Sequence, residues 1–218
     1  MIYKEKFKMK FKMNIPNTLT MIRIFCTPLM ALMFLLPIPK GIGVFIALGI
    51  YVLACITDSL DGHIARKYNM ITDFGKFMDQ IADKFITTTA MILVLFGSAP
   101  VTSKWLSVLM LLIVVLRDIL ISGIRMVAAN NNVVIAADIF GKVKSFFLDV
   151  SAMVLMLFVG LREVIANDFL RYVQVFGISL MIIGVVLTII SCVNYTVQAI
   201  KKLSAQEIPE EIVAEDEE

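Results

Sequence analysis

Six long apolar segments, separated by short polar breaks, run along the chain. The breaks contain Pro37 and Pro39, Pro100, the asparagines at 130–132, and Asn167. A helix needs about 20 apolar residues to cross the hydrocarbon core of a bilayer, and each segment is at least that long. The pattern predicts an all-α integral membrane protein with six transmembrane helices. We place these helices at 17–36, 43–66, 76–97, 104–128, 139–162 and 172–200.

Composition agrees with a membrane protein and excludes an ordinary soluble domain. Of the 218 residues 59% are hydrophobic and 17% are charged, against roughly 45–50% and about 25% in soluble domains. We predict one membrane domain at 14–203, preceded by a basic N-terminal extension at 1–13 and followed by an acidic C-terminal tail at 204–218. Met13 is a candidate alternative start. No cleavable signal peptide is expected, because the first apolar run lacks a small-residue cleavage site.

The distribution of basic residues predicts the orientation in the membrane. Six crossings place both termini on one side, and 16 of the 20 lysines and arginines fall on or near that side. Cytoplasmic segments carry the excess of positive charge. We therefore expect the chain to lie in the cytoplasmic membrane with both termini in the cytoplasm. A bacterial cytoplasmic membrane fits best. No nucleic-acid partner is expected. The four basic residues on the outer side are Lys40, Lys104, Arg162 and Arg171.

Four aspartates stand at the predicted cytoplasmic ends of the second and third spans. Asp58 and Asp61 are three residues apart and Asp79 and Asp83 four apart, so each pair shares one helical face. Antiparallel neighbouring helices would bring the two pairs together, and that many negative charges require a compensating cation. Oxygen ligands favour Mg²⁺ or Mn²⁺. Two such ions could hold a pyrophosphate and position an attacking hydroxyl group, so the expected site has two.

Small residues accompany the aspartates. Gly62 follows Asp61, Ala65 lies one turn further along the same face, and Gly75 lies four residues before Asp79. Missing or short side chains leave room for a nucleotide or for a second backbone. The alternative is close helix packing, which small residues commonly serve in membranes.

The spacing D-x2-D-G-x2-A-R-x8-G-x3-D-x3-D resembles the motif of the CDP-alcohol phosphatidyltransferase family, and all eight positions agree. This resemblance implies a six-helix fold with a polar active site near the cytoplasmic interface, and a homodimer. It also implies that all four aspartates bind metal and that Asp83 is the general base. The positions are Asp58, Asp61, Gly62, Ala65, Arg66, Gly75, Asp79 and Asp83, of which Gly62, Ala65, Arg66 and Gly75 would line the CDP site.

Segments 14–23, 117–129 and 133–145 are similar to one branch of that family, the phosphatidylglycerophosphate synthases. The branch implies CDP-diacylglycerol as donor and sn-glycerol 3-phosphate as acceptor. A dianionic acceptor calls for a cationic pocket. The candidates for acceptor phosphate binding are Arg117, Arg125, Lys142 and Lys144, and the alternative for each is an ion pair with Asp118 or Asp138, or a position among lipid headgroups.

Polar residues of the first span are further candidates. Asn17 and Thr20 would contribute to the CDP site, and Arg23 to the nucleotide or acceptor site, whereas the alternative role for all three is to cap and orient the helix.

Two other functions compete with this interpretation. The first is the same chemistry with a different acceptor, namely phosphatidylglycerol to make cardiolipin, serine or an inositol phosphate. The second is a cation transporter, because carboxylates within spans also mark ion paths. A transporter should carry charged or broken-helix features near midspan, whereas these aspartates cluster toward one face of the membrane.

Overall fold

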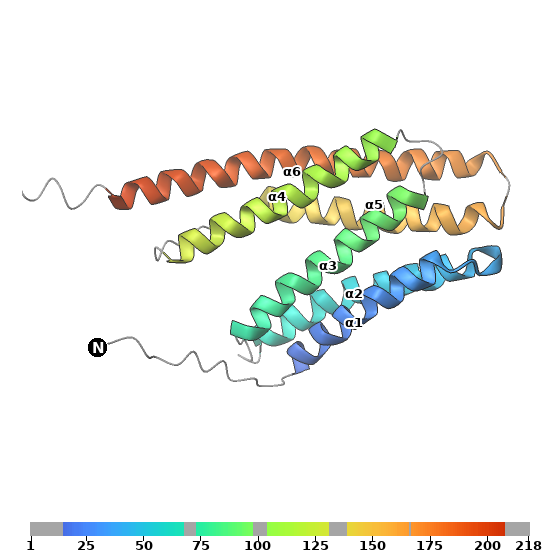
Figure 1. The fold of residues 1–218 in the computed structure, drawn as a ribbon, viewed down its shortest axis with the longest axis horizontal. Coiled ribbons are helices and arrows are strands. Elements are labelled where there is room, and N and C mark those ends of the chain that lie inside the picture. Colours follow the sequence, from blue (N-terminus) through green and yellow to red (C-terminus); the bar gives the residue numbers. More distant parts are fainter. Residues whose placement is uncertain (1–14, 68–72, 98–103, 131–138, 166, 208–218) are drawn as a thin grey trace, which may run out of the picture. The chain divides into compact units, whose positions relative to one another are not determined.

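The computed structural model describes residues 15–67, 73–97, 104–130, 139–165 and 167–207. Long α-helices and one short 3₁₀ helix make up the regular structure of these residues, and none of them forms a strand (Figure 1). The predicted all-α fold with six membrane-length helices is thereby confirmed. The elements are α1 (Ile15–Leu35), η1 (Pro39–Gly41), α2 (Ile42–Lys67), α3 (Asp73–Gly97), α4 (Lys104–Asn130), α5 (Ile139–Arg162) and α6 (Phe169–Glu207).

The last helix is the one whose length differs most from the prediction. We predicted a span at 172–200, but α6 has 39 residues and is therefore about 58 Å long, well beyond the roughly 30 Å of a hydrocarbon core. After the apolar part ends, the sequence continues with Lys, Ala, Gln and Glu, which are strong helix formers, and no Gly or Pro interrupts it before Pro209. The predicted extension at 1–13 lies outside the described residues, as does most of the predicted tail at 204–218.

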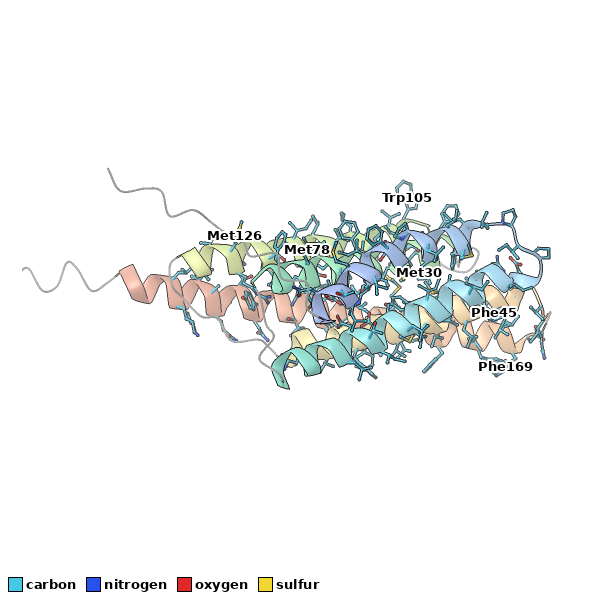
Figure 2. The ribbon with its side chains drawn as sticks, turned by 90° about the horizontal axis from the view of Figure 1, so that it is seen from below. Met30, Phe45, Met78, Trp105, Met126 and Phe169 are labelled. Carbon is cyan, nitrogen blue, oxygen red and sulfur yellow. The ribbon has the colours of Figure 1, made fainter. Side chains whose placement is uncertain are left out.

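Apolar side chains cover the outside of the helices. Trp105, Met126 and Phe169 point away from the helices that carry them (Figure 2), and 85% of the surface of Trp105 is exposed. Such exposure would be costly in water but suits a lipid environment, where the backbone groups are satisfied within each helix. Within the described residues, six helices each have a stretch long and apolar enough to cross a membrane, which supports a multi-pass membrane protein.

The chain divides into two compact units, which we describe separately. The first unit comprises residues 1–97 and 155–170. In it, α1 packs against both α2 and α3, whereas α2 and α3 touch each other much less. Met30 of α1, Tyr51 of α2 and Met91 of α3 are fully buried in its core. Helix α1 therefore connects the two helices that carry the four aspartates.

A close backbone contact fixes the turn between α1 and α2. Gly41 ends η1 with φ of 67°, a left-handed conformation that favours glycine. A Cβ atom at Gly41 would lie only 2.5 Å from the carbonyl oxygen of Gly160 in α5. Gly160 is itself closely packed on its other neighbour, because a Cβ atom built there would lie 3.1 Å from the ring of Phe45.

We expect Gly41→Ala to destabilise the protein by about 1–3 kcal/mol, through the strained backbone and the contact with the Gly160 carbonyl group. The measurement is thermal unfolding of the purified variant in detergent micelles. Gly49→Ala is the matched control, since a Cβ atom at Gly49 would meet no neighbouring heavy atom within 4 Å. Equal unfolding temperatures for the two variants would contradict the close contact.

The second unit comprises residues 98–154 and 171–218, and so contains α4, the first part of α5 and most of α6. Helices α5 and α6 approach closely here. The hydroxyl group of Ser151 donates a hydrogen bond of 2.8 Å to the carbonyl oxygen of Gly177, and a Cβ atom at Gly184 would lie 2.7 Å from Cδ2 of Leu148. Small residues on α6 thus allow the two helices to pack tightly.

Candidate functional site

Two of the four predicted metal ligands lie together in the first unit. Nη1 of Arg23, on α1, donates hydrogen bonds to Oδ1 of Asp58 on α2 at 2.5 Å and to Oδ1 of Asp79 on α3 at 3.4 Å. The two carboxylates thus converge on one nitrogen atom from two different helices. Their side chains remain 39% and 48% exposed, whereas the Arg23 side chain is 2% exposed. The arginine therefore approaches from the buried side, and the carboxylates stay accessible on the other side.

Of the other motif residues, the structure describes the side-chain environment only for those on α3. Asp83 lies one turn after Asp79 on the same face of α3 and is exposed, and Gly75 lies in the first turn of α3. The remaining motif residues belong to the last turns of α2, and their side chains lie outside the described part of the structure. They are Asp61, Gly62, Ala65 and Arg66.

The polar residues of the first span line one face of α1. Asn17, Thr20 and Arg23 recur every three residues and are all buried, with 6%, 3% and 3% of their surfaces exposed. Helix α1 begins at Ile15, before Asn17, so Asn17 lies inside the helix instead of at the position of an N-cap. This observation disfavours the capping alternative for Asn17 and leaves its contribution to the CDP site as a proposal.

Two of the predicted acceptor residues lie together in the second unit. Nζ of Lys144 on α5 is 2.8 Å from Oδ1 of Asp118, and Nη1 of Arg117 on α4 is 3.0 Å from the same oxygen. Nη2 of Arg117 also donates a 2.7 Å hydrogen bond to the hydroxyl group of Ser191 on α6. Lys144 is 4% exposed. We call Arg117, Asp118, Lys144 and Ser191 the cationic cluster, since two cations share a single carboxylate in it.

The other two predicted acceptor residues are placed differently. Arg125 and Lys142 are exposed. Eight residues advance a helix about 80° beyond two full turns, which explains why Arg125 is more exposed than Arg117. Lys142 and Lys144 are two residues apart, so they point to opposite sides of α5. The ion pair with Asp118, which the sequence left open as an alternative, forms for Arg117 and for Lys144; Asp138 lies outside the described residues.

The sequence analysis named Arg23 as a candidate for the nucleotide or acceptor site, but not as a partner of the aspartates. Its charge was the available signal, because an arginine inside an apolar span needs an anionic partner. The sequence analysis missed Ser191, which carries no such signal, since it is one of several hydroxyl groups in an apolar helix.

The carboxylates suit a hard divalent cation. Asp58 and Asp79 already converge on one positive charge, and carboxylate oxygens are the ligands that Mg²⁺ and Mn²⁺ prefer. Among the residues that the structure describes, no group of three or more acidic, histidine or cysteine side chains gathers at one point. Asp61, the ligand that the motif would add beside Asp58, is not among those described side chains. The donor set therefore fits the predicted metal without locating it.

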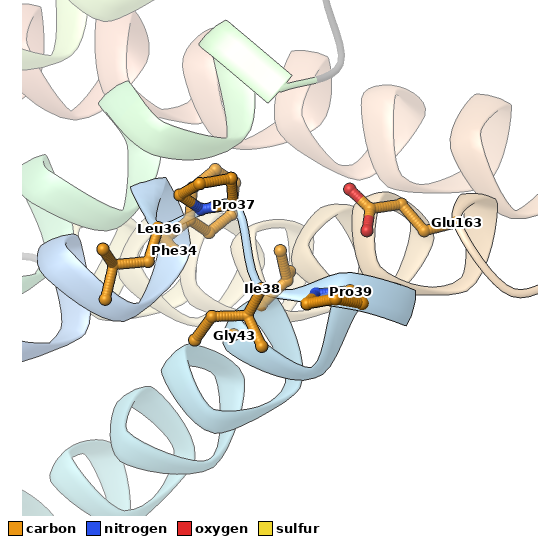
Figure 3. Close-up of a pocket in the computed structure, with 9 residues that line it drawn as sticks. Phe34, Leu36, Pro37, Ile38, Pro39, Gly43 and Glu163 are labelled. Carbon is orange, nitrogen blue, oxygen red and sulfur yellow. The ribbon is translucent and has the colours of Figure 1, made fainter.

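The pocket drawn in Figure 3 is a different feature of the first unit. It has a volume of about 240 Å³ and lies beside the connection from α1 to α2, and its lining includes Pro37, Pro39 and Glu163. None of the predicted site residues lines it. We therefore assign it no part in the site.

Comparison with known proteins identifies the family. The sequence pattern of the CDP-alcohol phosphatidyltransferases matches residues 13–190. The chain belongs to this family.

Curated relatives carry the name CDP-diacylglycerol–glycerol-3-phosphate 3-phosphatidyltransferase. The protein of that name from Bacillus subtilis (strain 168) is 36% identical over 155 residues, which cover 65% of this chain and 77% of the relative. The one from Rickettsia bellii (strain RML369-C) is 33% identical over 86% of this chain and 96% of its own length. The one from Shigella flexneri serotype 5b (strain 8401) is 33% identical over 84% and 92%.

Proposed function

We propose that the protein transfers the phosphatidyl group of CDP-diacylglycerol to sn-glycerol 3-phosphate, which yields phosphatidylglycerophosphate and CMP for phospholipid biosynthesis. The observation that carries the proposal is the similarity to relatives with that name over most of the chain, together with the family motif. The cationic cluster adds physical support, because two cations held close together suit a dianionic acceptor better than a neutral one.

The roles follow from the chemistry of each group. Asp83 accepts the proton of the acceptor hydroxyl group while the hydroxyl oxygen forms a bond to the β-phosphorus. The bond from that phosphorus to the bridging oxygen breaks, and CMP leaves with the electron pair. Bound divalent ions would supply electrostatic stabilisation of the pyrophosphate. The ligands proposed for two Mg²⁺ or Mn²⁺ ions are Asp58, Asp61, Asp79 and Asp83.

Binding of the substrates uses two further sets of residues. Asn17, Thr20 and Arg66 provide polar groups for CDP, and Gly62, Ala65 and Gly75 leave room for it. Arg117 and Lys144 bind the phosphate group of the acceptor, while Arg125 and Lys142, which are exposed, assist by attracting it.

The proposal includes the membrane setting. We place the chain in the cytoplasmic membrane. The excess of basic residues on one side favours an orientation with both termini and the active site facing the cytoplasm. Family resemblance supports a homodimer.

The test is CMP release by purified protein in detergent with CDP-diacylglycerol and Mg²⁺. Glycerol 3-phosphate, serine, an inositol phosphate and phosphatidylglycerol are supplied as separate acceptors. We expect release with glycerol 3-phosphate alone, its loss on chelation with EDTA, and its recovery on addition of excess Mg²⁺ or Mn²⁺. Release with another acceptor would support phosphatidyl transfer but would show that the acceptor is not glycerol 3-phosphate. Absence of release with every acceptor from folded protein would overturn the proposal and return attention to cation transport.

A further inference from the structure

Arg23 is a buried cation inside a membrane-length helix. It lies in the apolar stretch Asn17–Leu35 of α1, and its side chain is 2% exposed. Burying a guanidinium group is costly unless anionic groups and hydrogen bonds compensate it. The buried guanidinium group of Arg23 therefore requires anionic partners that compensate its charge.

Those partners are two of the proposed metal ligands. Arg23 binds Asp58 at 2.5 Å and Asp79 at 3.4 Å through one nitrogen atom, and so links α1 to both α2 and α3. Two carboxylates held this close would repel each other in the absence of a positive charge. The arginine supplies that charge from the protein itself.

We propose that Arg23 is a positioning residue that serves as a built-in counter-cation for the metal site. It holds Asp58 and Asp79 in place before a divalent ion arrives, and its charge lowers the affinity of the site for that ion. The inference rests on the metal site of the proposed function. Because the arginine lies on the buried side and the carboxylates remain 39% and 48% exposed, a second cation can approach them without crossing the arginine.

The proposal makes two opposite predictions for a variant without this charge. Removal of the charge leaves the carboxylates uncompensated, so the metal-free protein becomes less stable. The same removal makes the site more negative, so a divalent ion binds more tightly, by about tenfold or more, because a unit charge a few ångströms from a divalent ion costs at least that much affinity even with the screening of bulk water. By linkage, the metal then raises the unfolding temperature more than it does in the unchanged protein.

The experiment measures Mn²⁺ binding to the full chain in detergent, by the electron paramagnetic resonance signal of free Mn²⁺, and thermal unfolding with and without Mn²⁺. Arg23→Met removes the charge, and Arg23→Gln gives the same comparison if the methionine variant does not fold. Arg23→Lys retains the charge. Arg162→Met is the matched control, because Arg162 belongs to the same unit but is exposed and contacts the carbonyl oxygen of Gly97.

We expect tighter Mn²⁺ binding, a lower unfolding temperature without metal and a larger stabilisation by Mn²⁺ for Arg23→Met and Arg23→Gln only. Unchanged or weaker binding in both neutral variants, while the unchanged protein binds Mn²⁺ normally, would overturn the counter-cation role and leave the metal site standing. Tighter binding in Arg23→Lys would overturn it as well. If the unchanged protein bound no Mn²⁺, or if Asp79→Asn bound it equally well, the metal site and this inference would both fail.

Discussion

Asp83→Asn is expected to lower kcat for CMP release by about 10²- to 10⁴-fold, which is the usual contribution of a general base. The amide that replaces the carboxylate has nearly the same shape but cannot accept the proton of the acceptor hydroxyl group. It is also a weaker ligand for a divalent ion. Since Asp83 is exposed on α3, its replacement should leave the fold and the unfolding temperature nearly unchanged.

The measurement is steady-state CMP release with saturating CDP-diacylglycerol and glycerol 3-phosphate, at several concentrations of Mg²⁺. Asp168→Asn is the matched control, because Asp168 is an exposed aspartate of the same unit and lies between α5 and α6. If excess Mg²⁺ restored full activity to Asp83→Asn, the residue would be a metal ligand without a role as base. Activity equal to that of the control would remove Asp83 from the mechanism.

The fold could be predicted from the sequence because a bilayer leaves few choices. Backbone groups inside the hydrocarbon core must find their partners within the chain, so an apolar segment of about 20 residues becomes a helix, and its ends follow the polar breaks. Where the helix leaves the core this argument no longer applies. The extension of α6 to Glu207 depends on the helix propensity of polar residues, and the contact between Gly41 and Gly160 depends on tertiary packing that no local pattern encodes.

In the candidate site, too, contacts between helices that are neighbours in the sequence could be predicted, whereas contacts that depend on tertiary packing could not. Asp58 and Asp79 lie on consecutive helices joined by a short connection, so their proximity could be predicted. The role of Arg23 could not, because it depends on α1 packing against both of those helices. Helical periodicity shows that Lys142 and Lys144 face opposite sides of α5, but it does not say which of them is buried. The bond from Arg117 to Ser191 joins residues 74 positions apart.

Lys144→Met is expected to raise KM for glycerol 3-phosphate by about 10- to 150-fold and to leave KM for CDP-diacylglycerol nearly unchanged. A charge-assisted hydrogen bond to a phosphate group is worth about 1.5–3 kcal/mol, which corresponds to that range. An ammonium group has three N–H donors, so its bond to Asp118 does not exclude a phosphate ligand. Methionine fills a similar buried volume, and Asp118 keeps its ion pair with Arg117.

Initial-rate measurements with each substrate varied in turn test this expectation, with Lys201→Met as the matched control, since Lys201 is exposed near the end of α6. An unchanged KM for glycerol 3-phosphate, combined with a lower unfolding temperature, would show that Lys144 serves only the ion pair with Asp118. A larger effect from Lys142→Met would move the acceptor site to the exposed side of α5. The selective effect in Lys144→Met would instead assign the acceptor phosphate to the cationic cluster, since burial gives Lys144 a fixed position that an exposed lysine lacks.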